Sequence, residues 1–225
     1  MNALNVKALT SLPVLISIMA ALIFIPAGTF NYWQAWIFLG VYFASALVIT
    51  LYLMKKNPEL LRRRITGGPT AEKQAAQKII MSLASLGFVG LLVVPALDHR
   101  FAWSHVSRPM ELIGNALVVL GFLGVLRVFQ ENSYTFSTIE VAADQRVIST
   151  GPYALIRHPM YAAALGMLIG IPIALGSYCG LIVFAAVGGV VVWRLMDEES
   201  FLEANLPGYR DYQMKVGHRL IPGIW

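Results

Sequence analysis

The feature that most constrains this fold is a run of 47 residues, 8–54, without a charged side chain. A helix needs about 20 residues to cross the hydrocarbon core of a bilayer, so the run is too long for one crossing and suits two. A proline, a glycine and an asparagine at positions 26–31 supply turn chemistry near its middle. We therefore expect membrane spans over about 8–26 and 33–54.

Further gaps between charges extend this pattern. Residues 79–97 suit one more span, and 112–126 suit a fourth if the long Arg127 side chain lies in its last turn. The last gap, 159–193, holds 35 residues, which fits two short helices joined by a tight turn near 172–177. The expected fold is all-α: a polytopic integral membrane protein with about six transmembrane helices, a C-terminal helical hairpin and a helical tail.

Composition supports one membrane domain over residues 1–225. The chain is 57% hydrophobic and 13% charged, whereas soluble domains are about 25% charged, which excludes a soluble globular domain. A single cysteine, Cys179, excludes an intramolecular disulfide. Four scattered histidines without a cysteine pair lead us to expect no metal site.

The placement of Lys and Arg predicts the orientation. The loop at 55–78 holds seven of them, and with six spans this loop, residues 130–158 and the tail share one side. The positive-inside rule makes that side the cytoplasm, so we expect both termini and these polar segments to be cytoplasmic. The same loop accounts for most of the net charge of +5, so the expected partners are membrane lipids and not nucleic acid.

The remaining polar residues gather at the two ends of the hairpin. Arg157 and His158 precede its first helix, and Arg194, Glu198 and Glu199 follow its apolar part. A tight hairpin brings its ends together, so we expect these five side chains to lie near one another at the membrane surface. The simpler alternatives are interfacial anchors at a helix start and a solvated acidic turn.

Local signals define both ends of the hairpin. Pro159 suits the first turn of a helix, whose exposed N–H groups favour an anion, and Tyr161 is expected on the same face as Arg157. Carboxylates oppose the dipole at a helix C-terminus, so the second helix is expected to continue to about residue 206. Tyr209 and Tyr212 then begin a further helix, with a packing role.

Two motifs resemble the isoprenylcysteine carboxyl methyltransferase family: GPYALIRHPMYAA at 151–163 and EESFLEANLPGYRDY at 198–212. This family belongs to a wider group of integral membrane methyltransferases that includes phospholipid N-methyltransferases. The resemblance implies a methyltransferase core over 130–225, preceded by four spans in 1–129 with the cytoplasmic loop at 55–78.

The resemblance also implies S-adenosylmethionine as the cofactor, bound at the cytoplasmic membrane surface. It implies a lipophilic small-molecule or prenylated substrate that enters from the bilayer. The implied catalytic residues are Arg157, Arg194 and Glu199, and the implied substrate-binding residues are Arg194 and Asn205. The implied cofactor-binding residues are Gly151, Pro152, Tyr153, His158, Pro159, Tyr161, Glu198 and Glu199.

The residues leave the methyl acceptor open. A carboxylate acceptor is already ionised at neutral pH and needs a positioning cation such as Arg194, giving a methyl ester. An amine acceptor, as in a phospholipid or other amine N-methyltransferase, needs a glutamate as base. A nicotinamide-dependent membrane reductase of similar fold and a non-enzymatic membrane protein are the further alternatives.

Overall fold

The computed structural model describes residues 3–65, 72, 74–135, 138–139, 141–142 and 145–225. Its described part is helical, without strands. The helices are α1 (Ala3–Ala27), α2 (Trp33–Lys56), α3 (Pro58–Ile65), α4 (Ala75–Phe101), α5 (Arg108–Glu131), α6 (Pro159–Ala174), α7 (Gly180–Asn205) and α8 (Tyr209–Lys215), with a short 3₁₀ helix η2 (Gly151–Ala154) before α6.

The expected all-α, polytopic membrane fold is confirmed. Five helices, α1, α2, α4, α5 and α7, are long and apolar enough to cross a membrane. The sixth expected span, α6, has only 16 residues, which gives a length of about 24 Å at 1.5 Å per residue, less than the hydrocarbon thickness. Each long helix extends beyond its charge-free run at one end or both.

The basic segment after α2 is not entirely a loop. It contains α3, whose Leu60 and Leu61 are buried and pack in a cluster with Ala8, Leu53 and Phe129. The expectation of a loop over 55–78 was therefore wrong for this part. The cause is local: two adjacent leucines anchor the helix against α1, α2 and α5, while the side chains of Arg62 and Arg63 remain exposed.

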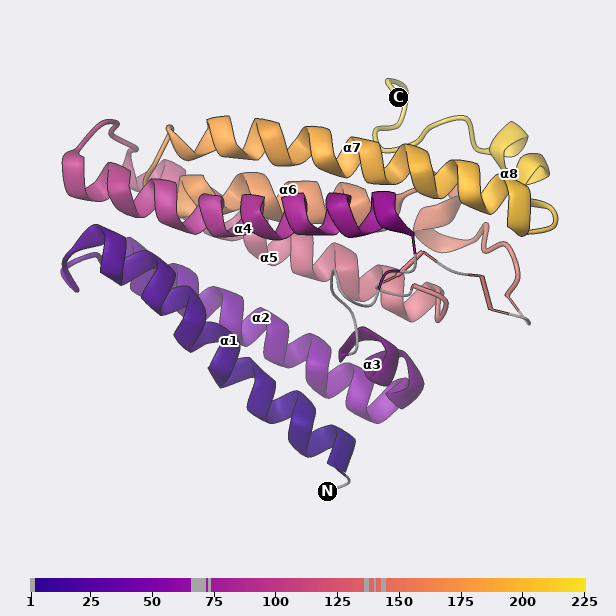
Figure 1. The fold of residues 1–225 in the computed structure, drawn as a ribbon, viewed down its shortest axis with the longest axis horizontal. Coiled ribbons are helices and arrows are strands. Elements are labelled where there is room, and N and C mark those ends of the chain that lie inside the picture. The colour runs from indigo at the N-terminus through magenta and orange to yellow at the C-terminus, as the bar shows by residue number, and fades with distance from the viewer. Residues whose placement is uncertain (1–2, 66–71, 73, 136–137, 140, 143–144) are drawn as a thin grey trace.

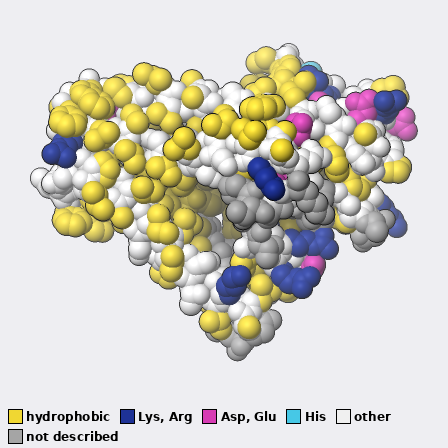
Figure 2. All heavy atoms as spheres, in the orientation of Figure 1, with side chains coloured by type: hydrophobic (Ala, Val, Ile, Leu, Met, Phe, Trp, Pro, Cys, Tyr) yellow, Lys and Arg dark blue, Asp and Glu magenta, His cyan; other side chains and the backbone are white. Residues whose placement is uncertain are grey.

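Figure 1 shows α4, α5, α6 and α7 running alongside one another, while α1 and α2 slant away from them toward α3. The α1–α2, α4–α5 and α6–α7 connections lie at one end of the molecule. The segment between α5 and α6, together with α3 and α8, lies at the other. Figure 2 shows a largely hydrophobic surface over the helices, with most of the charged side chains gathered at the end that carries α3 and α8.

Small residues let α5 and α6 approach closely. A Cβ atom added to Gly114 would lie 2.3 Å from the backbone nitrogen of Ala174, and one added to Gly170 would lie 2.7 Å from the carbonyl oxygen of Gly114. Close backbone contact of this kind is a main source of helix association in membranes. It fixes α6, and so the start of the hairpin, against α5.

Replacing Gly114 with alanine is expected to destabilise the protein by about 1–3 kcal/mol, because the added methyl group meets backbone that cannot move aside locally. Thermal unfolding in detergent measures the change. Gly166→Ala on α6 is the matched control, since its Cβ would have nothing within 4 Å and alanine favours a helix by about 1 kcal/mol over glycine. Equal effects of the two substitutions would contradict the close contact.

Candidate functional site

The two ends of the α6–α7 hairpin meet, as expected. Glu199 Oε1 accepts hydrogen bonds from Arg157 Nε at 2.6 Å and from His158 Nε2 at 3.1 Å. All three side chains are almost fully buried. Pro159 occupies the first turn of α6. The juxtaposition inferred from the hairpin is therefore confirmed.

The C-terminal tail completes this buried charge cluster. Arg219 Nε donates to Glu199 Oε2 at 2.8 Å. The backbone N–H groups of Arg157 and His158 donate to the carbonyl oxygens of His218 and Arg219, at 2.9 and 3.0 Å. Sequence reasoning missed Arg219, because nothing local in the tail indicates that it folds back onto the start of α6.

The two adjacent glutamates point to different partners. Glu198 accepts a hydrogen bond from the Tyr161 hydroxyl, whereas Glu199 binds Arg157. Arg157 and Tyr161 were expected to share a helical face, which is wrong because α6 begins only at Pro159 and Arg157 lies outside it. Successive residues on α7 are about 100° apart, which separates the two carboxylates.

A cavity of about 360 Å³ lies beside this cluster. Its lining comes from the segment after α5, from η2, from the starts of α4 and α6, from the end of α7 and from α8. The expected site residues that line it are Tyr153, Arg157, His158, Pro159, Tyr161, Arg194 and Glu198. The expected site residues outside its lining are Gly151, Pro152, Glu199 and Asn205.

Glu199 lies behind the cavity wall, where the side chains of Arg157, His158 and Arg219 bind its carboxylate. This placement disagrees with the expectation that Glu199 contacts the cofactor or acts in catalysis. Its contacts suit a positioning role, because it fixes Arg157 and His158, which do line the cavity.

The turn at Gly151 and Pro152 shapes the site without lining it. Gly151 has a φ of +56°, and a Cβ atom there would lie 2.5 Å from a carboxylate oxygen of Glu131. The turn presents Tyr153, whose hydroxyl accepts a hydrogen bond from Asn132 Nδ2 at 3.0 Å. Tyr153 is therefore the part of this motif that reaches the cavity.

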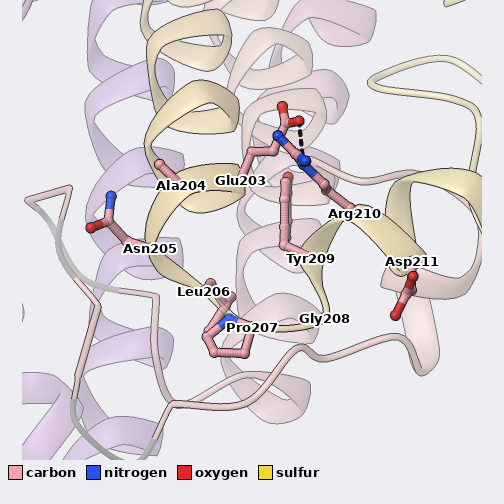
Figure 3. Close-up of a pocket in the computed structure, with 9 residues that line it drawn as sticks. All are labelled: Glu203, Ala204, Asn205, Leu206, Pro207, Gly208, Tyr209, Arg210 and Asp211. Carbon is pink, nitrogen blue, oxygen red and sulfur yellow. Dashed lines mark hydrogen bonds and ion pairs between the residues drawn. The ribbon is translucent and has the colours of Figure 1, made fainter.

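Asn205 does not line the cavity. Figure 3 shows it on the side of α7 opposite Arg210, at the rim of a smaller hollow formed by residues 203–211. Its amide donates to the carbonyl oxygen of Phe201 at 2.8 Å and is exposed. The expected substrate-binding role does not agree with this placement, because α7 continues as a helix to Asn205 and turns the side chain outward.

Arg194 is held from the N-terminal half of the chain. Its guanidinium donates to Glu72 Oε1 at 2.9 Å and to Gln77 Oε1 at 2.7 Å, and Gln77 in turn donates to Asp197. Glu72 and Gln77 are 4% and 1% exposed. Sequence reasoning missed both, since they lie more than 110 residues from Arg194.

Two tyrosines of α8 also reach the cavity. Burial raises the pKa of Tyr212 to about 12, and the Tyr212 hydroxyl donates to the carbonyl oxygen of Tyr153 at 2.7 Å. Burial, with the charges of Glu199 and Glu198, raises the pKa of Tyr209 further. The Tyr209 hydroxyl is buried without a hydrogen-bond partner within the described part of the chain. The two were expected to act as a packing pair, and their rings lie 5.8 Å apart.

Arg64 supplies a further cation to the cavity. Its guanidinium lies over the Phe129 ring, 4.7 Å from the ring centroid, and donates to the carbonyl oxygen of Thr135 at 3.0 Å. Burial lowers its pKa to about 10, so it remains charged at neutral pH. Among the described residues it forms no ion pair with a carboxylate, unlike Arg157 and Arg194.

Residues 110–207, somewhat less than half of the chain, match the family model of the phospholipid methyltransferases. This family belongs to the same group of integral membrane methyltransferases that the motifs resemble, so the resemblance is confirmed for this segment. No curated protein matches the chain closely enough to count as a relative. The match covers the hairpin and both glutamates and indicates a membrane methyltransferase, whereas Arg64, Glu72, Tyr209 and Arg219 lie outside it.

Proposed function

We propose that this protein is an S-adenosylmethionine-dependent methyltransferase of the membrane that modifies a lipophilic acceptor. The observation that carries the proposal is the cavity at the ends of the α6–α7 hairpin, which combines Glu198, His158 and Arg157 with an apolar wall. The family match over residues 110–207 supports the same reaction class. When bound, S-adenosylmethionine supplies a methyl group activated by its sulfonium centre.

The cavity residues fit the chemical groups of this cofactor. The Glu198 carboxylate accepts the Tyr161 hydroxyl through Oε2, which leaves Oε1 to accept from ribose hydroxyls or from an ammonium group. The start of α6, where Arg157 and His158 line the cavity, suits a carboxylate. Tyr209 adds a buried hydroxyl that has no partner among the residues the structure describes.

The acceptor is proposed to carry an anionic group, most simply the carboxylate that becomes the methyl ester. Arg157 and Arg194 are paired with Glu199 and Glu72, whereas Arg64 pairs with no carboxylate among the described residues, so we assign to Arg64 the positioning of such a group. Methyl transfer is an in-line displacement, and orientation supplies much of its rate. Amine N-methylation of a phospholipid is the second candidate. The family match favours it, and Arg64 would then bind the phosphate.

The apolar wall supports a substrate that enters from the bilayer. Met81 of α4, Ala164 of α6 and Val191 of α7 line the cavity on the side of the spanning helices. The basic residues of α3 and the end of α2 lie at the same end of the molecule as the cavity. By the positive-inside rule we propose that this end faces the cytoplasm of a bacterial inner membrane, in contact with anionic lipids.

A methyl-transfer assay tests the proposal. The purified full chain is incubated with S-adenosylmethionine labelled in its methyl group and a total lipid extract. We expect a labelled lipid product, and its lability in base separates a methyl ester from a methylamine. Calorimetric titration should detect binding of S-adenosylmethionine and not of a nicotinamide cofactor. Absence of both binding and transfer by the folded protein would overturn the proposal.

Replacing Tyr209 with phenylalanine is expected to weaken binding of S-adenosylmethionine or of the acceptor by about 2- to 12-fold, the contribution of one neutral hydrogen bond. The substitution should not lower the stability of the unliganded protein, since the Tyr209 hydroxyl has no partner to lose in the described part of the chain. Titration calorimetry and the acceptor KM measure the effect. Tyr212→Phe is the control: it breaks the bond to Tyr153 and should mainly lower stability. Unchanged affinity for both ligands in Tyr209→Phe would contradict a ligand-binding role.

A further inference from the structure

Three buried oxygen atoms without a hydrogen-bond partner gather at the end of the molecule opposite the cavity. Within the described part of the chain, four buried side-chain nitrogen or oxygen atoms lack a partner. One is the Tyr209 hydroxyl, and the other three are Gln34 Oε1, Glu111 Oε2 and Asn115 Oδ1. All three atoms accept hydrogen bonds. What they require is therefore a donor or a cation.

The three side chains form one connected cluster between helices α2 and α5. Gln34 Nε2 donates to Glu111 Oε1 at 2.9 Å, and Asn115 Nδ2 donates to the Glu111 carbonyl oxygen at 3.0 Å. Each amide therefore uses its nitrogen within the cluster and keeps its oxygen for another partner. The α6–α7 turn closes the cluster, since a Cβ added to Gly176 would lie 3.1 Å from Glu111 Oε1.

Glu111 is an exceptional buried acid for this protein. It is 3% exposed and takes part in no ion pair among the described residues. Asp98, buried at the same end, shows how such a group is normally satisfied: it accepts from the Ser104 backbone at 2.7 Å and from the Ser104 and Ser177 hydroxyls at 2.5 Å each. Glu111 has one side-chain donor among the described residues, Gln34. A buried carboxylate with so few donors is costly unless another charge balances it.

The number of unpaired acceptors distinguishes the possible partners. A proton on Glu111 Oε2 would satisfy that oxygen and donate to one other, leaving one acceptor unpaired. One water molecule donates two hydrogen bonds and also leaves one unpaired. A cation differs from both, because one ion can take more than two oxygen ligands. Hard oxygen ligands suit an alkali or alkaline-earth ion, and the single carboxylate charge balances a monovalent one.

We propose that Glu111, Gln34 and Asn115 bind one small monovalent cation of the sodium type. The site would connect the starts of α2 and α5 to the α6–α7 turn. It does not depend on methyl transfer, because it lies at the opposite end of the molecule from the cavity.

Thermal unfolding of the full chain in detergent tests the site, with NaCl replaced stepwise by choline chloride at constant ionic strength. We expect sodium to raise the unfolding midpoint in a saturable way, by about 3–6 °C at ten times its dissociation constant. Glu111→Gln should abolish this rise, because it removes the charge while keeping the shape. Glu198→Gln, at the other end of the molecule, should keep it.

Two results would overturn the proposal. One is an unfolding midpoint that is the same in sodium and in choline. A midpoint that depends on pH and not on sodium belongs to this case, and would indicate that a proton occupies the cluster. The other is a Glu111→Gln variant that keeps the full sodium effect. If that variant does not fold, the proposal is tested instead by measuring the binding of radioactive sodium to the wild-type chain. One ion per chain, displaced by unlabelled sodium and not by choline, supports the site, and no bound ion overturns it.

Discussion

Glu199→Leu will lower the free energy of unfolding by about 3–5 kcal/mol, because removal of one partner of a buried ion pair leaves the other charge unbalanced. Three groups lose their acceptor together: Arg157, His158 and Arg219. Arg157 is the most affected, since its guanidinium is always charged and its side chain is only 6% exposed. At this chain length the unfolding midpoint should fall by about 6–20 °C, which thermal unfolding in detergent measures.

A matched pair of variants separates charge from shape in this prediction. Glu199→Gln keeps an oxygen that accepts hydrogen bonds and should be less damaging than leucine. Glu203→Gln on the same helix removes a carboxylate from an exposed pair with Arg210 and should change stability by no more than about 1 kcal/mol. If Glu199→Leu were as stable as Glu203→Gln, the cluster would not hold the hairpin ends together.

The charge-free runs predicted the spans because hydrophobic length is a local property of the sequence. The hairpin argument succeeded for a similar reason: a short connection forces residues 157–158 and 194–199 to be neighbours, whatever the side chains are. The tight turn at 151–153 and the proline at the start of α6 also follow from local backbone preferences. The helices and turns that position the site could therefore mostly be predicted from the sequence.

The residues that sequence reasoning missed are those whose contacts are distant along the chain. Glu72 and Gln77 reach Arg194 from the N-terminal half, and Arg219 returns from the tail to Glu199. No periodicity or turn signal connects such segments. Glu111 was missed for another reason: the expected fourth span began after it, whereas α5 begins at Arg108 and carries it into the buried interface.

The choice between Glu198 and Glu199 also required the structure. The sequence identified an acidic pair at the end of the hairpin, and helical geometry separated the two residues by about 100°. Neither the acidic pair nor the helical spacing shows which face of α7 meets the cavity. Contacts with Tyr161 on one side and with Arg157 on the other assign Glu198 to the cavity wall and Glu199 to the cluster behind it.

Glu198→Gln will weaken S-adenosylmethionine binding by about 10- to 100-fold while leaving the protein folded, which reflects the loss of one charged hydrogen bond. The substituted amide oxygen can still accept the Tyr161 hydroxyl, so the unfolding midpoint should stay close to that of the wild type. The neighbouring substitution at Glu199 is expected to do the opposite, with its main effect on stability. Titration calorimetry measures the affinity, and Glu203→Gln serves again as the control.

The pattern of affinity and rate then identifies the role of Glu198. A raised dissociation constant, with single-turnover methyl transfer unchanged at saturating cofactor, supports direct contact with S-adenosylmethionine. An unchanged dissociation constant with a lower rate would contradict that contact and indicate a general base acting on an amine acceptor. Because the two glutamates are adjacent in the sequence and differ in what surrounds them, opposite outcomes at Glu198 and Glu199 would also test the orientation of α7 at the cavity.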